Sequence, residues 1–124
     1  MAVHSAMQRA VIHMMQRRAE QNLLDAVGTY FHHATPGLGK ELETYQNREW
    51  GEKQKNKAIA GMHYFDQVLE SQDYIAGQDF SMADITLYMG LAFADLAKVP
   101  ISAESKHLAA WRAKVAERPS VKGL

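Results

Sequence analysis

The polar residues best placed for chemistry lie near the middle of the first helical stretch of the chain. Arg18, Asn22, Asp25 and Thr29 are spaced four, three and four residues apart, so in an α-helix they would share one face. A guanidinium, an amide, a carboxylate and a hydroxyl on one face can bind a polar ligand. The same spacing is typical of a solvated stripe with local ion pairs, and the residues alone favour that second interpretation.

Two adjacent histidines, His32 and His33, end the same stretch. Imidazole is a common metal ligand, but two cations at a helix C-terminus are also stabilised by the helix dipole. We favour the dipole, because no other pair among the six histidines has a ligand spacing with a carboxylate between its members. We therefore expect no metal site. The absence of cysteine also excludes disulfides, thiolate nucleophiles and Cys-based zinc sites.

The composition excludes several classes of partner. Lys plus Arg and Asp plus Glu each number 14, so the chain has no cationic field for a nucleic acid or a membrane surface. No apolar run approaches the roughly 20 residues of a membrane span. Residues 1–5 lack a basic segment followed by an apolar core, so we expect no signal peptide. These features predict a cytoplasmic protein that forms one domain over residues 1–124.

The clearest element start is at Ser81. Its hydroxyl is placed to cap a helix, and Asp84, three residues later, can complete a capping box. Phe80 before the cap and Ile85 after the first turn are placed to form a hydrophobic staple. The following residues, 85–94, are apolar nearly all round, which predicts a buried helix. We expect all four residues to stabilise the fold and not to take part in catalysis.

Helical periodicity extends over most of the chain. It predicts helices over about residues 5–33, 49–71, 81–98 and 105–117, with residues 41–48 left open. The three prolines fall between these stretches, and Gly77 is expected in a turn. No convincing strand is present. The predicted fold is an all-α bundle of four to five helices.

Several stretches resemble one family, the glutathione transferases of the bacterial type, in their C-terminal helical domain. Residues 80–87, Phe-Ser-Met-Ala-Asp-Ile-Thr-Leu, resemble its capping box, and residues 75–77 resemble the lead-in. Residues 14–20 resemble its first long helix and residues 49–52 the start of its next one. Residues 111–121 resemble its closing helix and exit. These pieces occur in the family's order and cover nearly the whole chain.

The resemblance implies roles for the stripe. In the family, the first long helix faces the cleft between the two halves of the enzyme and the opposite subunit. Met15, Arg18, Asn22, Asp25 and Thr29 are then expected to bind a small hydrophobic electrophile, and Arg17 and Arg18 to lie at a homodimer interface. Glutathione is the implied co-substrate of the parent enzyme, bound by a thioredoxin-like half for which this sequence shows no pattern. We expect no catalytic residue and no bound cofactor in this chain, which alone should be inactive.

Two other functions stay open. Similar helical domains join partners in translation-associated proteins, such as elongation factor 1 gamma and some aminoacyl-tRNA synthetases, so the chain could be a free-standing interaction module. It could also be a purely structural domain without a ligand. A transferase half should dimerise or expose an apolar face where the other half of the enzyme packs.

Overall fold

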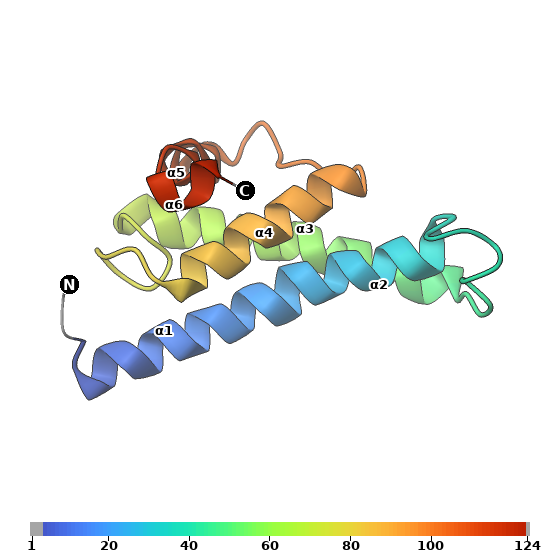
Figure 1. The fold of residues 1–124 in the computed structure, drawn as a ribbon, viewed down its shortest axis with the longest axis horizontal. Coiled ribbons are helices and arrows are strands. Elements are labelled where there is room, and N and C mark those ends of the chain that lie inside the picture. The colour runs from blue at the N-terminus through green and yellow to red at the C-terminus, as the bar shows by residue number, and fades with distance from the viewer. Residues whose placement is uncertain (1–3, 124) are drawn as a thin grey trace.

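The computed structural model describes residues 4–123, all of them in helices, turns and irregular segments (Figure 1). The elements are α1 (Ala6–Ala19), the π-helical turn η1 (Glu20–Leu24), α2 (Asp25–Ala34), α3 (Arg48–Ser71), α4 (Met82–Leu96), α5 (Lys106–Ala116) and α6 (Pro119–Lys122). The all-α prediction is confirmed, and the only β feature of the described residues is an isolated bridge between Tyr74 and Gly77. Residues 1–3, on which the signal-peptide expectation partly rests, lie outside the described range.

The first three elements form one continuous rod. It matches the helix expected over residues 5–33 except for η1, where the backbone N–H of Asp25 bonds to the carbonyl of Glu20, five residues earlier. Two glycines of other helices lie against this turn. A Cβ at Gly61 of α3 would lie 2.7 Å from the carbonyl oxygen of Asn22, and one at Gly90 of α4 would lie 3.0 Å from Cδ2 of Leu23. Both α3 and α4 therefore approach the rod closely at the π turn.

The rod, α3 and α4 run side by side, and α5 and α6 lie over one end of this layer (Figure 1). The core between them is filled by fully buried apolar side chains from every long helix. They include Leu23, Phe65, Leu87, Leu91, Leu108 and Val115. Burial of this kind contributes about 25 cal/mol per Å² of apolar surface, so packing holds the helices together.

The start of α4 forms as predicted. The Ser81 hydroxyl accepts a hydrogen bond from the backbone N–H of Ala83 at 3.2 Å, and the Asp84 carboxylate accepts from the N–H of Ser81 at 2.9 Å. The ring of Phe80 has other neighbours than the expected one: it contacts Tyr74 edge-on and lies 3.8 Å from the guanidinium carbon of Arg118. Ile85 is 41% exposed, and the staple between Phe80 and Ile85 stays a prediction.

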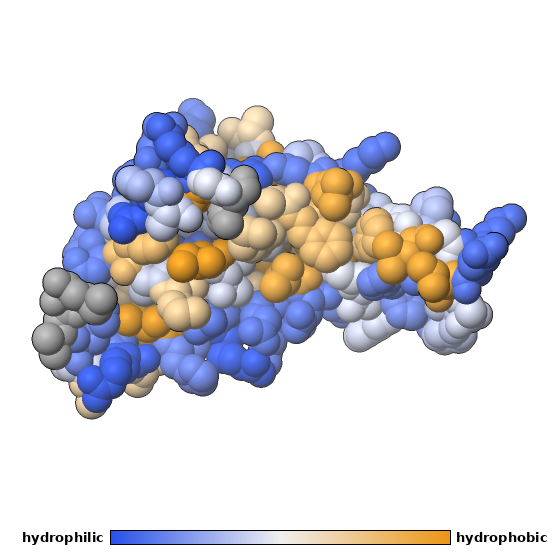
Figure 2. All heavy atoms as spheres, viewed as in Figure 1, coloured by the Kyte–Doolittle hydropathy of each residue, from blue (hydrophilic) through white to orange (hydrophobic). Residues whose placement is uncertain are grey.

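One expectation for α4 is wrong, because the helix is not buried all round. Four exposed apolar residues, Met82, Ile85, Met89 and Leu96, and the half-buried Phe93 are spaced three or four apart and so share one face, hereafter the α4 apolar face. Leu96 is 77% exposed and Met82 is 60% exposed. Figure 2 shows apolar residues gathered along α4 on the side that Figure 1 presents. A sequence that is apolar all round could not reveal which side stays uncovered.

Candidate functional site

Two residues of the predicted stripe line a hollow beside α4. This α2–α4 hollow has a volume of about 530 Å³ and is lined by Leu24, Asp25, Gly28, Thr29, His32, His33 and Phe93. Gly28 faces the ring of Phe93, whose edge would lie at an ordinary contact distance of 3.9 Å from a Cβ at this position. The Asp25 carboxylate and the Thr29 hydroxyl are one helical turn apart on α2. The hollow thus combines an aromatic ring with a carboxylate, a hydroxyl and imidazoles, as a pocket for a largely apolar ligand requires.

The remaining stripe residues lie elsewhere. The Arg18 guanidinium donates a hydrogen bond to the hydroxyl of Tyr64 on α3, and the Asn22 backbone lies against Gly61 of the same helix. The spacing of four, three and four presumed an uninterrupted α-helix. Since η1 lies between Arg18 and Asp25, the later residues are rotated relative to the earlier ones. The structure therefore brings Asp25 and Thr29 together and separates them from Arg18 and Asn22.

Met15 belongs to the second group. Only 4% of its surface is exposed, and its sulfur lies 3.7 Å from the Tyr64 hydroxyl and 4.0 Å from Nη1 of Arg18. The Arg18 guanidinium also lies 5.6 Å from the centre of the Tyr64 ring. Arg17 forms an ion pair of 2.7 Å with Glu20, one turn along the same rod. Both arginines thus have partners within the chain, and their side chains remain exposed enough to take part in a further contact.

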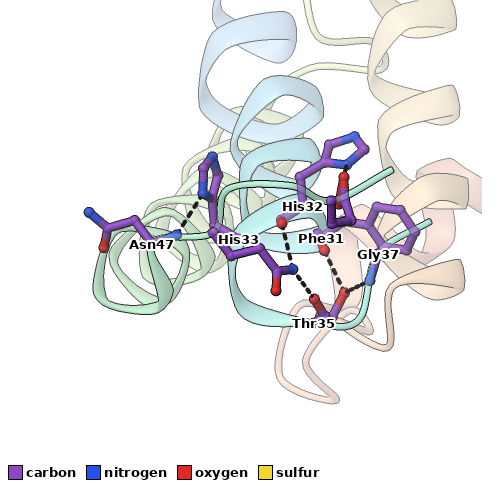
Figure 3. A network of polar contacts seen from close by, with 8 residues as sticks. Phe31, His32, His33, Thr35, Gly37 and Asn47 are labelled. Carbon is purple, nitrogen blue, oxygen red and sulfur yellow. Dashed lines mark hydrogen bonds and ion pairs between the residues drawn. The ribbon is translucent and has the colours of Figure 1, made fainter. Parts of the chain in front are cut away.

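The two histidines at the end of α2 have different partners (Figure 3). Nδ1 of His32 lies 2.8 Å from a carboxylate oxygen of Glu43, whereas Nδ1 of His33 accepts a hydrogen bond of 2.9 Å from the N–H of Asn47. Both imidazoles thus hold the segment that follows α2, His32 through a side chain and His33 through the backbone. The expectation that the two histidines act as cations at the α2 C-terminus stays a prediction.

The segment 35–47 closes the end of α2 without a helix of its own, which settles the stretch that the sequence left open. The Gln46 amide donates to the carbonyls of His32 and Thr35, at 2.9 and 2.7 Å, and so satisfies two acceptors that a helix end leaves unpaired (Figure 3). The Thr35 hydroxyl donates to the Phe31 carbonyl and accepts from the N–H of Gly37 at 3.0 Å. This network fixes His32 at the rim of the α2–α4 hollow.

Asp84, at the start of α4, is a carboxylate with no exposed surface. Burial raises the pKa of its carboxyl, against the opposing effect of hydrogen bonds from Ile75, Ser81 and Trp111. Because Asp84 is fully buried and bonded on all sides, its perturbed pKa reflects a structural role. It lies at the α4 N-terminus and does not line the hollow.

Within residues 4–123, no group of three or more His, Asp or Glu side chains is arranged to hold a metal ion. Over the same range, none of the helices combines the length and the apolar character that crossing a membrane requires.

Sequence reasoning missed five of the residues that line the hollow: Leu24, Gly28, His32, His33 and Phe93. Gly28 carried only a weak signal, because it is a glycine inside a predicted helix. Phe93 carried none, because it lies in a run that is apolar on every side. His32 and His33 were considered as metal ligands and as charges at a helix end, but not as the lining of a pocket.

The chain resembles known proteins over nearly its whole length. Residues 29–123 match the family model described as glutathione S-transferase, C-terminal domain. "Glutathione S-transferase 2" of Saccharomyces cerevisiae is 56% identical over 118 residues, which cover 95% of this chain and 51% of that protein. The chain thus spans about half the length of this curated relative.

Solved structures agree with this match. The crystal structure of Gtt2 from Saccharomyces cerevisiae has a TM-score of 0.95 at 54% identity, with 98% of this chain and 58% of that chain covered. A glutathione S-transferase domain-containing protein from Marinobacter aquaeolei has a TM-score of 0.92 at 54% identity, with 96% and 58% covered.

Proposed function

Because the chain belongs to the glutathione S-transferase family, as a C-terminal domain of it, we propose that it is the helical half of an enzyme that conjugates glutathione to small hydrophobic electrophiles. In this proposal glutathione is the co-substrate and is bound mainly by a thioredoxin-like half of the enzyme. The observation that carries the proposal is the α4 apolar face. It is a helical row of large apolar side chains, with Leu96 77% exposed, on a chain that spans about half of its relatives.

Exposed apolar surface of this kind marks an interaction site. We assign the α4 apolar face to the glutathione-binding half, because the relatives contain about as much chain again as the part matched here. The α2–α4 hollow shares Phe93 with this face. A second half seated on α4 would therefore border the hollow and turn it into a cleft with two walls.

In that cleft, Phe93 and Leu24 offer apolar surface to the electrophile, and Asp25 and Thr29 offer polar contacts that orient it. Met15, Arg18 and Asn22 lie beside α3, outside the hollow. Their part in substrate binding, if the second half reaches them, stays a prediction. Arg17 and Arg18 are our candidates for a homodimer interface, since each keeps exposed surface beyond its partner within the chain.

The test is a chimera in which this chain follows the glutathione-binding half of the Saccharomyces cerevisiae relative. We expect the chimera to conjugate glutathione to an aryl halide and the 124-residue chain alone to show only the uncatalysed rate. Asp25→Asn and Thr29→Val in the chimera should raise the KM for the electrophile. Gln21→Ser is the matched control, at an exposed position of the same rod outside the hollow, and it should leave the KM unchanged. A folded but inactive chimera would contradict the proposal.

If the chain is instead a free-standing interaction module, which the sequence left as the alternative, the α4 apolar face would bind a protein partner. No structural observation favours that function over the transferase half.

A further inference from the structure

Another pocket lies away from the α2–α4 hollow, between α3 and the segment that follows α4. Its volume is about 230 Å³, below the roughly 300–1,000 Å³ of sites for drug-sized ligands. Its lining combines apolar side chains with three basic groups and two hydroxyls. The lining residues are Lys55, Ile59, Met62, His63, Lys98, Val99, Pro100, Ser102 and Ser105. No carboxylate is among them.

The backbone of Lys98 is the most unusual feature of this pocket. Lys98 has φ of 63°, and it is the only described residue other than glycine with a positive φ. It follows α4 at the position where a left-handed residue ends a helix: its N–H bonds to the carbonyl of Asp95, and the next N–H, of Val99, bonds to Ala94. Glycine is the usual residue at this position because a side chain is strained there. The lysine side chain therefore adds backbone strain at this position, and ending the helix does not require a lysine.

The basic groups lack acidic partners. Among residues 4–123, neither Lys55 nor Lys98 has a carboxylate oxygen within 4.0 Å. The Lys55 ammonium lies 5.2 Å from the centre of the Tyr30 ring, a contact that leaves its charge uncompensated. The pocket thus has a positive rim over an apolar floor made by Met62 and Val99, which are 2% exposed.

Ser105 supplies an independent observation. It is 1% exposed, and its hydroxyl has no hydrogen-bond partner among the described residues. Ser105 precedes α5, but it does not cap that helix with its side chain; the carboxylate of Asp66 accepts from the N–H of Leu108 instead, at 2.8 Å. A buried hydroxyl without a partner is unfavourable. Because Ser105 is one of the lining residues, this unpaired hydroxyl lies in the wall of the pocket.

We propose that this pocket binds a small carboxylate with a short apolar chain. The chain lies on Ile59, Met62 and Val99, and the carboxylate meets the ammonium groups of Lys98 and Lys55. The ligand's chemistry follows from the lining: an apolar floor excludes strongly hydrated inorganic anions, and the absence of acidic residues excludes cations. This site is separate from the electrophile hollow and does not depend on the proposed transferase function.

The test uses the 124-residue chain and two probes of equal size, hexanoate and hexanamide. Calorimetric titration and methyl NMR should show saturable hexanoate binding, with shifts at Ile59, Met62 and Val99. Hexanamide should bind about tenfold or more weakly, since a hydrogen bond to a charged group is the stronger one. Equal binding of the two probes, or shifts that do not saturate, would overturn the proposal.

Lys98→Gly separates ligand binding from folding. Because glycine relieves the left-handed strain, this variant should melt at a higher temperature than the parent chain and still lose hexanoate affinity by about tenfold. Lys57→Ala is the control, since Lys57 is an exposed lysine of α3 outside the pocket, and it should bind hexanoate normally. Unchanged hexanoate affinity in Lys98→Gly would refute the site, and a lowered melting temperature would refute the strain on which it rests.

Discussion

The indole Nε1–H of Trp111 in α5 donates a hydrogen bond of 2.9 Å to Oδ1 of Asp84 at the start of α4. The same oxygen accepts from the backbone N–H of Ile75 at 3.1 Å, while Oδ2 accepts from Ser81. One buried carboxylate thus joins the α4 cap, the connector before it and α5. The position of α4, and with it the α4 apolar face, depends on this carboxylate.

Asp84→Ala should therefore lower the free energy of unfolding by more than the loss of a helix cap alone would. Losing the cap alone would cost about 1–2 kcal/mol, but the variant also leaves the buried N–H groups of Trp111 and Ile75 without acceptors. We expect a total of about 3 kcal/mol or more. Ser81→Ala, which removes only the capping hydroxyl, should cost about 1 kcal/mol. Urea denaturation of both variants measures the difference, and equal losses would mean that Asp84 is only a cap.

The stability of the chain should depend on pH through Asp84. Burial raises the pKa of this carboxyl in the folded state, so as the pH rises from about 4 the carboxyl ionises first in the unfolded chain. The unfolded state then binds fewer protons than the folded state, and the free energy of unfolding falls as the pH rises. The contribution of Asp84 to stability is fully present below the pKa that its carboxyl has in the unfolded chain. It is lost as the pH rises through the higher pKa of the folded chain.

Asp84→Asn isolates this effect, because a neutral amide oxygen still accepts from Trp111 and Ile75. Between pH 4 and pH 7, the parent chain should lose stability relative to this variant. Chemical denaturation at a series of pH values gives the two curves. A parent chain that gains stability relative to the variant over this range would show that hydrogen bonds outweigh burial at Asp84.

Gly61→Ala should destabilise the contact between α3 and the π turn. A Cβ at residue 61 would lie 2.7 Å from the backbone oxygen of Asn22, which cannot move without shifting the rod. We expect a loss of about 1–3 kcal/mol, as for other overpacked sites. Gly28→Ala is the matched control: its Cβ would meet only Phe93 at 3.9 Å, so better helix propensity should make it neutral or stabilising by up to about 1 kcal/mol. Similar melting temperatures for the two variants would contradict the close approach at η1.

Leu96→Asp should separate folding from association. Since Leu96 is 77% exposed, the charge should shift the melting temperature of the chain alone by little. In the chimera with the glutathione-binding half, the same charge would lie in an apolar interface and should lower conjugation activity at least about tenfold. Ala110→Asp, at an exposed site of α5, should leave the activity unchanged. Full activity of the Leu96→Asp chimera would mean that the α4 apolar face does not lie in the interface with the glutathione-binding half.

The sequence predicted the helices well because their signals are local. The capping box at Ser81 and Asp84 and the helical periodicity over residues 49–71 depend on residues a few positions apart, and the structure contains both. The π turn has no such signal. In this turn, Asn22 packs against Gly61 and Leu23 packs against Gly90. These glycines lie 39 and 67 residues further along the chain, so no local pattern could reveal the contacts.

The candidate site was only partly predictable for the same reason. The spacing of an uninterrupted α-helix predicted that the stripe from Arg18 to Thr29 lies on one face. In the structure, η1 divides this stripe into two parts. Phe93 joins the hollow through the packing of α4 on α2, which no spacing within either helix encodes. The buried bonds of Asp84 to Ile75 and Trp111 likewise link segments that are distant in sequence.

The most direct test of the transferase-half assignment is the size of the native gene product. An antibody raised against this chain would be used on a lysate of the source organism under denaturing conditions. The account predicts a band at about twice 13.9 kDa, since the chain spans 51% of its curated relative. A single band at 13.9 kDa would contradict it: the helical unit would then act without a covalently attached glutathione-binding half, and the α4 apolar face would belong to a separate partner.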